Sequence, residues 1–152
     1  MLTMPTKSQL VYNNSTKIIL FLFAQMSFIS YLCDMGKIRE VITYKSFFDD
    51  FFREQSPKVR TKIIKVLDII EQLDRIPITY LKYIEGTDGL FEIRVLLGNN
   101  IFRIFCFFDG NKLVVLLSGF QKKTQKTPPD EINKAVRLKT EYYNEKEKEK
   151  KK

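Results

Sequence analysis

The sequence predicts an α+β domain in which a small antiparallel sheet packs against an N-terminal helical hairpin and a C-terminal helix. Three observations predict this class. A short β-rich segment precedes two closely linked helical stretches, three β-rich runs are joined by hairpin signals, and a last helical stretch follows Pro128-Pro129. With 44% hydrophobic and 29% charged residues, the composition is that of an ordinary globular protein.

The first elements are a strand and a helical hairpin. Residues 37–44 (KIREVITY) are β-rich and short, as is typical of an edge strand. Ser46 is a suitable N-cap for the short helix FFDDFFRE, and Ser56-Pro57 supplies a cap and a first-turn proline for the next helix. The apolar residues of that second helix recur every three or four positions to about Arg75, and Pro77 ends it.

Three strands and a helix are predicted next. The strands are 90–97 (LFEIRVLL), 101–108 (IFRIFCFF) and 112–120 (KLVVLLSGF), and the turns between them contain Gly-Asn and Asp-Gly, which are strong hairpin signals. Asp130 is the expected cap of the last helix, whose apolar residues are only loosely periodic. The order is therefore strand, two helices, three antiparallel strands and a helix.

The N-terminal segment does not share this pattern. Residues 18–33 (IILFLFAQMSFISYLC) form an apolar run that is shorter than the roughly 20 residues of a membrane-spanning helix. A secretory signal, a membrane anchor and a natural start at Met35 are the alternatives, and the last is preferred because regular patterning begins there. We expect an apolar extension at 1–34, a domain at 35–143, a charged tail at 144–152, a cytoplasmic location and no membrane partner.

The residue types that are missing exclude several chemistries. The chain has no histidine, which excludes a Ser-His-Asp triad, a Cys-His pair, a His-ligated zinc and a two-histidine ribonuclease. Its two cysteines, Cys33 and Cys106, form neither a metal-binding motif nor a disulfide framework, so a reducing compartment is expected. The net charge of +8 is concentrated in residues 90–152, which carry fourteen basic and eight acidic side chains. This excess indicates a polyanionic partner, nucleic acid first.

Strand parity assigns the side chains of the three strands to two faces. One face is apolar and is expected to lie against the helices, with Cys106 as a reduced core residue without a catalytic role. It carries Phe91, Ile93, Val95, Phe102, Ile104, Cys106, Phe108, Leu113, Val115 and Leu117. The other face is mixed, aromatic and basic. It carries Glu92, Arg94, Ile101, Arg103, Phe105, Phe107, Leu116, Ser118 and Phe120.

Two arginines on the mixed face are the main functional signal. A turn at Gly98-Asn99 places Arg94 directly opposite Arg103, and a turn one residue further makes them diagonal neighbours. Like charges in this position destabilise a sheet unless an anion neutralises them. Either Glu92 or a helix carboxylate neutralises the pair, or the pair binds phosphate, for which the planar guanidinium group is suited. Nearby aromatic rings would then offer stacking surfaces for bases.

A lysine-rich segment follows the last strand. Residues 119–128 (GFQKKTQKTP) carry Lys122, Lys123 and Lys126 among hydroxyl and amide side chains such as Gln125. The position of this segment at the rim of the arginine face predicts a concave phosphate site. The site lacks a Walker A motif and an evident metal-ligand cluster, so neither a cofactor nor a metal is expected.

These residues resemble a known family. EGTDGLFEIR, NIFRIFCFF, DGNKLVVLL and GFQKKTQKTP are similar to the phage-derived branch of the HigB/RelE toxin superfamily, over about residues 37–143. The resemblance implies the RelE-like fold and a ribosome-dependent endoribonuclease that cuts mRNA in the A site. The implied partners are a cognate antitoxin, expected to be a helix-turn-helix protein, the 70S ribosome and mRNA.

The resemblance also implies roles for individual residues. Arg103 would stabilise the phosphate, Lys122 and Lys123 would take part in catalysis, and the 2′-OH of the RNA would attack the adjacent phosphate. The residues expected to bind substrate are Arg94, Lys126, Phe120, Gln125 and Ser118. Ser118 stands where many relatives have histidine, so only lysine, carboxylate or tyrosine could transfer protons here. The alternatives are a toxin on the same fold that acts by binding, for example to gyrase, a decayed toxin, and a plain nucleic-acid-binding module.

Overall fold

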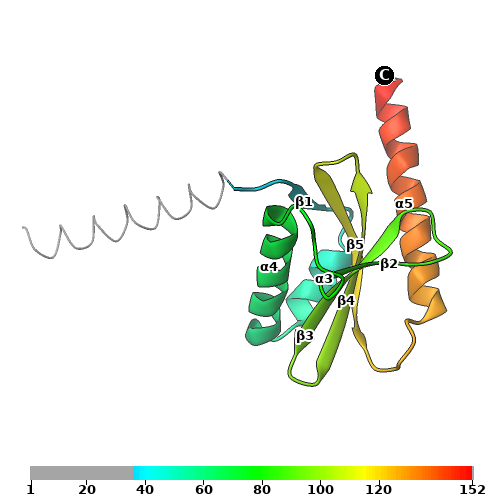
Figure 1. The fold of residues 1–152 in the computed structure, drawn as a ribbon. Coiled ribbons are helices and arrows are strands. Elements are labelled where there is room, and N and C mark those ends of the chain that lie inside the picture. Colours follow the sequence, from blue (N-terminus) through cyan, green and yellow to red (C-terminus); the bar gives the residue numbers. More distant parts are fainter. Residues whose placement is uncertain (1–35, 152) are drawn as a thin grey trace, which may run out of the picture. The chain divides into compact units, whose positions relative to one another are not determined.

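A mixed five-stranded sheet organises residues 36–151, which are the residues that the computed structural model describes (Figure 1). The elements in chain order are β1 (Glu40–Thr43), α3 (Phe47–Glu54), α4 (Pro57–Gln72), β2 (Leu81–Tyr83), β3 (Leu90–Leu97), β4 (Asn100–Asp109), β5 (Leu113–Lys122) and α5 (Pro129–Lys150). This arrangement confirms the predicted α+β class. The interpretations of residues 1–34, Met35 and Cys33 lie outside the described residues. Among residues 36–151, no helix has the length and apolar character needed to cross a membrane.

The central strands form the predicted antiparallel meander. The strand order across the sheet is β1-β5-β4-β3-β2. Leu97 pairs with Asn100, so the first hairpin turns over Gly98-Asn99, and Gly98 has the positive φ of 58° that such a turn requires. This register places Arg94 directly opposite Arg103, as predicted.

Both edges of the sheet differ from the simplest expectation. β1 is an edge strand, as predicted, but it runs parallel to β5, with Glu40 opposite Leu113, so the sheet is mixed rather than purely antiparallel. The other edge is β2, a three-residue strand on β3 that the sequence analysis missed. A segment of this length, with Pro77 close before it, gives too few alternating residues to be recognised.

The helices begin close to the predicted residues. Ser46 is the N-cap residue of α3, although its side chain makes no capping hydrogen bond. Ser56 caps α4, its hydroxyl accepting a hydrogen bond from the Val59 amide at 3.4 Å. The expected cap at Asp130 is wrong, because α5 begins at Pro129 with Pro128 as its N-cap, which places Asp130 in the first turn. α5 then continues through most of the predicted tail to Lys150.

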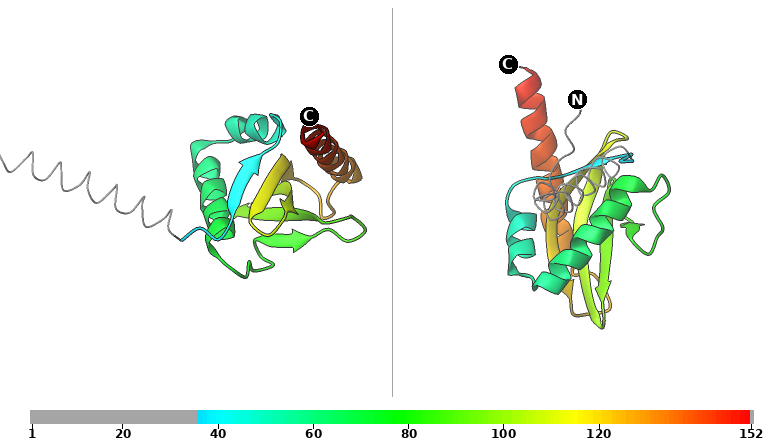
Figure 2. Two further views of the ribbon diagram at one scale, coloured as in Figure 1. Left: turned by 90° about the horizontal axis from the view of Figure 1, so that it is seen from above. Right: turned by 90° about the vertical axis from the view of Figure 1, so that its left-hand side faces the viewer.

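Each face of the sheet carries its own apolar core. α3 and α4 cover one face and α5 covers the other, as the view from above shows (Figure 2). The core on the α3/α4 face contains Phe48, Phe51, Val59, Ile63, Val66, Ile70, Ile93, Val95, Phe102, Ile104, Cys106, Val114 and Leu116. The core on the α5 face contains Leu90, Phe105, Phe107, Val115, Leu117, Ala135 and Leu138. The part of the expected mixed face around Phe105 and Phe107 is therefore a packed apolar core.

A β-bulge changes the face of the sheet on which several β5 side chains lie, compared with the prediction. The register shifts between Phe105 and Cys106, so that Phe105 pairs with Ser118 but Cys106 pairs with Leu116. One extra residue reverses the parity of the strand before it. The residues whose predicted face was wrong are Leu113, Val115 and Leu117, which belong to the α5 face, and Leu116, which belongs to the α3/α4 face.

Cys106 lies where it was predicted. It is a free cysteine, fully buried in the core on the α3/α4 face. Burial in apolar surroundings raises the pKa of its thiol far above the ordinary value. A protonated, inaccessible thiol is a poor nucleophile, so Cys106 is a core residue.

Candidate functional site

The arginine pair lies on the two central strands of the meander. Arg94 on β3 and Arg103 on β4 are directly opposite residues of an antiparallel pair, so both side chains lie on the α5 face. Their exposures differ sharply: the Arg94 side chain is 32% exposed, whereas Arg103 is 3% exposed. Arg94 is thus partly exposed to solvent, whereas Arg103 is in the interior of the protein.

Glu92 forms ion pairs with both arginines. Its Oε1 atom lies 3.6 Å from the Nε of Arg94 and 3.5 Å from the Nε of Arg103. Glu92 itself is only 7% exposed, and its Oε2 accepts a hydrogen bond from the Thr127 hydroxyl at 3.3 Å. The sequence analysis left open whether a carboxylate neutralises the pair; Glu92 pairs with both arginines, and its single charge offsets one of their two.

The hydrogen bonds of the Arg103 guanidinium are incomplete. One terminal nitrogen donates to the carbonyl of Phe102 at 3.0 Å, but Nε has no hydrogen-bond partner among the described residues. Burial lowers the pKa of Arg103, the charge of Glu92 raises it and the charge of Arg94 lowers it further. Arginine keeps its proton in proteins even so. Arg103 is therefore a buried cation with spare donor capacity.

The other predicted residues of the face surround Arg103. Phe120 lies directly opposite Arg103, and its ring centroid is 5.5 Å from that of Phe105. Phe105 and Phe107 are buried in the core beneath α5, so Phe120 is the half-buried ring nearest to the pair in register. Ser118, opposite Phe105, is 1% exposed, and its hydroxyl has no hydrogen-bond partner among the described residues.

The predicted lysines lie on the strand end and the following segment. Lys122 is half-buried at the end of β5, opposite Ile101. Lys123, Gln125 and Lys126 are exposed, and the hydroxyl of Thr124 holds a local turn by donating to the Lys126 carbonyl at 2.8 Å. The contact between this segment and the arginine pair comes from Thr127, through Glu92.

Gly119 is a residue whose role sequence reasoning missed. A Cβ atom at this position would lie 2.3 Å from Cδ1 of Phe51, well inside contact distance. Phe51 is buried in the core on the α3/α4 face, so its ring has little room to move. The Gly-Phe pair that opens the lysine-rich segment thus has two functions: Gly119 admits α3 close to β5, and Phe120 faces the arginines.

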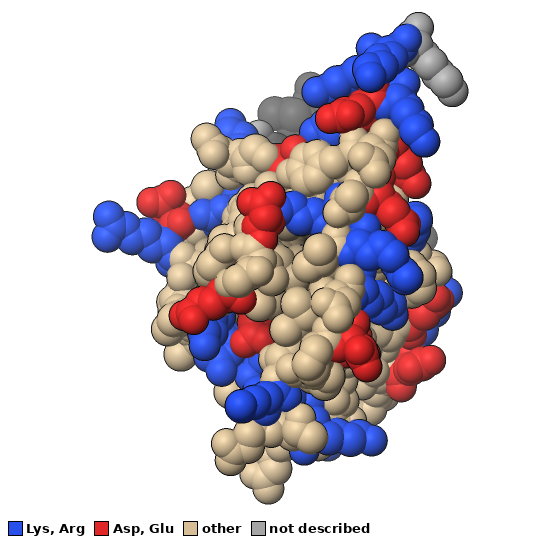
Figure 3. Space-filling model, turned by 90° about the vertical axis from the view of Figure 1, so that its right-hand side faces the viewer, with Lys and Arg blue, Asp and Glu red and all other residues tan. Residues whose placement is uncertain are grey.

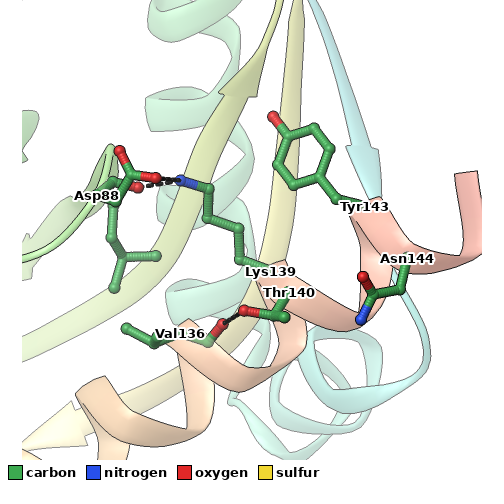
Figure 4. A pocket seen from close by; sticks show the side chains of 7 residues that line it. Asp88, Val136, Lys139, Thr140, Tyr143 and Asn144 are labelled. Carbon is green, nitrogen blue, oxygen red and sulfur yellow. Dashed lines mark hydrogen bonds and ion pairs between the residues drawn. The ribbon is translucent and has the colours of Figure 1, made fainter. Parts of the chain in front are cut away.

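A second concave region lies away from the arginines, between the β2–β3 turn and α5. It has a volume of about 440 Å³, and its walls include Asp88, Lys139 and Tyr143. Figure 4 shows Lys139 reaching from α5 toward Asp88, whose backbone carbonyl accepts a hydrogen bond from the ammonium group. The same ammonium lies 5.7 Å from the centroid of Phe107. Lys139 thus joins α5 to the turn, a structural role that the sequence analysis did not identify.

On the side of the molecule that carries α5, the charged surface is mixed and not uniformly basic. Figure 3 shows Lys and Arg side chains interleaved with Asp and Glu over much of this face, with basic side chains gathered toward the C-terminal end of α5. Residues 36–151 include no group of three or more Asp, Glu or Cys side chains arranged to hold a metal ion.

The fold and the site together define a small α+β protein with an arginine pair, bridged by one glutamate, on one face of a mixed sheet. Residues 50–140 match the family described as "Phage derived protein Gp49-like (DUF891)". Because this match spans more than half of the chain, the protein belongs to that family, which confirms the phage-derived branch expected from the sequence. A comparison with curated proteins finds no match.

Partial similarity is found to solved structures of antitoxin–toxin complexes. One is the RelB-RelE complex from Methanococcus jannaschii, with a TM-score of 0.42 and 16% identity over 57% of this chain and 99% of that one. Another is the RelE-RelB complex from Pyrococcus horikoshii OT3, with a TM-score of 0.40 and 18% identity over 54% of this chain and 92% of that one.

Proposed function

We propose that this protein is the toxin of a RelE-type toxin–antitoxin system and that it cuts mRNA on the 70S ribosome in the cytoplasm, without a cofactor. The observation that carries the proposal is the arginine pair, Arg94 opposite Arg103, in which the Nε of Arg103 makes no hydrogen bond among the described residues. Membership of the Gp49-like family supports the toxin assignment, together with the resemblance of residues 37–143 to RelE-like toxins. A paired antitoxin belongs to the same proposal.

In the proposed reaction, the RNA 2′-OH attacks the adjacent phosphate, and the 5′-oxygen leaves. Charge on the nonbridging oxygens grows in the transition state, and fixed cationic donors in a water-poor setting stabilise such charge strongly. Arg103 is the donor for this role because it is buried, and Arg94 positions the substrate because it is more exposed. Phe120 offers a ring on which a base can stack.

Proton transfer is assigned to Lys122 and Lys123 at the end of β5. The assignment rests on the position of these lysines after the last strand and on the absence of histidine from the sequence, and lysine can act as a general base only when its ammonium form is disfavoured. Gln125 and Lys126, on the exposed segment, would contact the RNA backbone, and Ser118 would add a hydroxyl beside Arg103. The ribosome would supply much of the remaining geometry by positioning the mRNA.

Arg103 provides the test of this function. Arg103→Ala should abolish growth inhibition and lower cleavage about 100-fold or more, the scale of a single electrostatic stabiliser. The measurements are mapping of mRNA 5′ ends after induction in cells, and the melting temperature of the purified variant. Lys65→Ala, which removes a cation from an exposed position of α4, is the matched control. Unchanged cleavage by folded Arg103→Ala would refute the catalytic assignment.

A second function is favoured by the burial of Arg103 and its ion pair with Glu92. A site whose arginines already share a carboxylate of the protein suits a toxin that inhibits its target by binding and does not cleave RNA. Growth inhibition by the wild-type protein without new mRNA 5′ ends would select this alternative.

A further inference from the structure

The position of Glu92 raises a question for any ligand of the arginine pair. Its carboxylate lies within 3.6 Å of both Nε atoms, which is where a phosphate recognised by both arginines would have to bind. Two anions in one such place repel each other strongly at low solvent exposure. A phosphate and the Glu92 carboxylate therefore compete for the arginines.

In this structure, the Glu92 carboxylate between the two arginines satisfies their hydrogen-bond donors only in part. The two Nε–Oε1 distances, 3.5 and 3.6 Å, are longer than a charge-assisted hydrogen bond, which is about 2.7–2.9 Å. The buried Nε of Arg103 is left without a hydrogen bond among the described residues. One carboxylate shared between two guanidinium groups thus leaves donors that a phosphate, with more oxygens, could satisfy.

The structure also contains a second place for the carboxylate. A cavity of about 200 Å³ adjoins Glu92, and Lys82, Tyr83, Glu85 and Thr127 are among the residues that line it. Lys82 on β2 lies directly opposite Glu92 on β3, so its side chain is on the same face of the sheet. A rotation of Glu92 away from the arginines would bring its charge toward this lysine.

We propose that Glu92 is an exchangeable internal anion: it occupies the arginine pair in the free protein and moves toward Lys82 when a phosphate of the substrate binds. Thr127 donates a hydrogen bond to the second carboxylate oxygen of Glu92 and so holds the carboxylate beside the arginines. The same bond connects Glu92 to the segment that carries Lys123 and Lys126. The inference deepens the proposed function, because it concerns how the same site admits an RNA phosphate, and it rests on that proposal for the identity of the ligand.

The exchange predicts opposite effects for the two groups that flank Glu92. Glu92→Gln removes the competing charge, so we expect the apparent affinity for phosphate to rise about fivefold or more, within the usual range of coupling between two ligands. Lys82→Ala removes the cation that receives the displaced carboxylate, so phosphate binding should weaken, although Lys82 would not touch the phosphate. In the Glu92→Gln background, Lys82→Ala should have little effect, because no carboxylate charge remains to be displaced.

Two probes are used with the full chain at constant ionic strength. Inorganic phosphate is followed by the rise in melting temperature relative to chloride, and a labelled 2′-O-methyl RNA, which cannot be cleaved, is followed by fluorescence anisotropy. Glu147→Gln and Lys65→Ala remove the same charges from exposed positions of α5 and α4 and should bind as the wild type does. Equal affinities of wild type, Glu92→Gln and Lys82→Ala for both probes would overturn the exchange.

A second variant keeps the test decisive if Glu92→Gln does not fold. Thr127→Val leaves every charge in place and removes the hydrogen bond to Glu92, so it should bind phosphate about twofold more tightly. Thr127→Val and Lys82→Ala that both bind as the wild type does would then overturn the exchange. The proposed function fails differently: either RNA would remain uncleaved on the ribosome, or Arg103→Ala would cleave as the wild type does, whatever the order of phosphate affinities.

Discussion

The two faces of the sheet solve the same packing problem with different chemistry. The face beneath α3 and α4 carries a large apolar core, of which Cys106 is part. The face toward α5 is apolar around Phe107 and Leu117, but it contains the Glu92–Arg94–Arg103 cluster next to that core. One face is thus determined by shape and hydrophobicity, whereas the other also depends on the ion pairs of a charged cluster whose Glu92 and Arg103 are buried.

The largest expected effect comes from unbalancing that charge. Glu92→Ala should lower the free energy of unfolding by about 3–5 kcal/mol, because it leaves Arg103 buried without a counter-ion. Urea denaturation measures the loss. The double variant Glu92→Ala, Arg103→Leu should recover much of it, since the buried charge is gone. A loss below about 1 kcal/mol would mean that solvent already reaches Arg103.

The apolar face is tested most sharply at Gly119. Gly119→Ala should cost about 2 kcal/mol, the scale of overpacking, because the new methyl group would lie 2.3 Å from the ring of Phe51. Thermal unfolding is the measurement. The double variant with Phe51→Leu should be less destabilised than the sum of the single changes, because the smaller side chain makes room. Full additivity would contradict the contact.

Cys106 probes the same face by removal rather than addition. Cys106→Ala should cost on the order of 1 kcal/mol through a small cavity and leave the growth inhibition by the folded protein unchanged. The raised pKa also predicts that the native thiol reacts slowly with labelling reagents. Labelling at the rate of an unfolded control would show that the core opens readily.

The smallest effect concerns pH, on the α5 face. Lys146 and Tyr142 donate hydrogen bonds to Asp109, and these lower the pKa of Asp109 below its ordinary value of 3.8. The stabilisation is therefore present above pH 4 and is lost as the pH falls through the lowered pKa. Burial, followed by the bond to Asp109, raises the pKa of Tyr142 to about 12 from 10.0, so its contribution disappears between these values as pH rises.

Asp109→Asn is the variant for this test. Its stability, measured by urea denaturation from pH 2 to pH 6, should fall less steeply with acid than that of the wild type. The apolar side chains of the α3/α4 face should contribute nothing to the pH dependence of stability in either protein. Identical acid profiles of variant and wild type would show that Asp109 makes no net contribution to the pH dependence.

The same contrast explains what the sequence could predict. The arginine register followed from Gly98-Asn99, because a two-residue turn fixes the pairing of every residue in the hairpin. The bulge beside Ser118 had no signal, since leucine suits either face of a strand that is covered on both sides. The burial of Arg103 was beyond reach, because it depends on tertiary packing that no local pattern encodes, although Glu92 could be named as a candidate partner.

The parallel pairing of β1 with β5 has a consequence for the order of folding. Residues 44–112 separate the paired segments, so their pairing closes a long loop and is slow compared with local hairpins. During synthesis, β1 emerges well before its partner strand. Until β5 arrives, β1 can be held by α4: the Arg39 guanidinium beside it donates to the carbonyls of Ile70 and Leu73 at the end of that helix, at 2.7 and 2.6 Å. Arg39 thus ties the first strand to α4 independently of its pairing with β5.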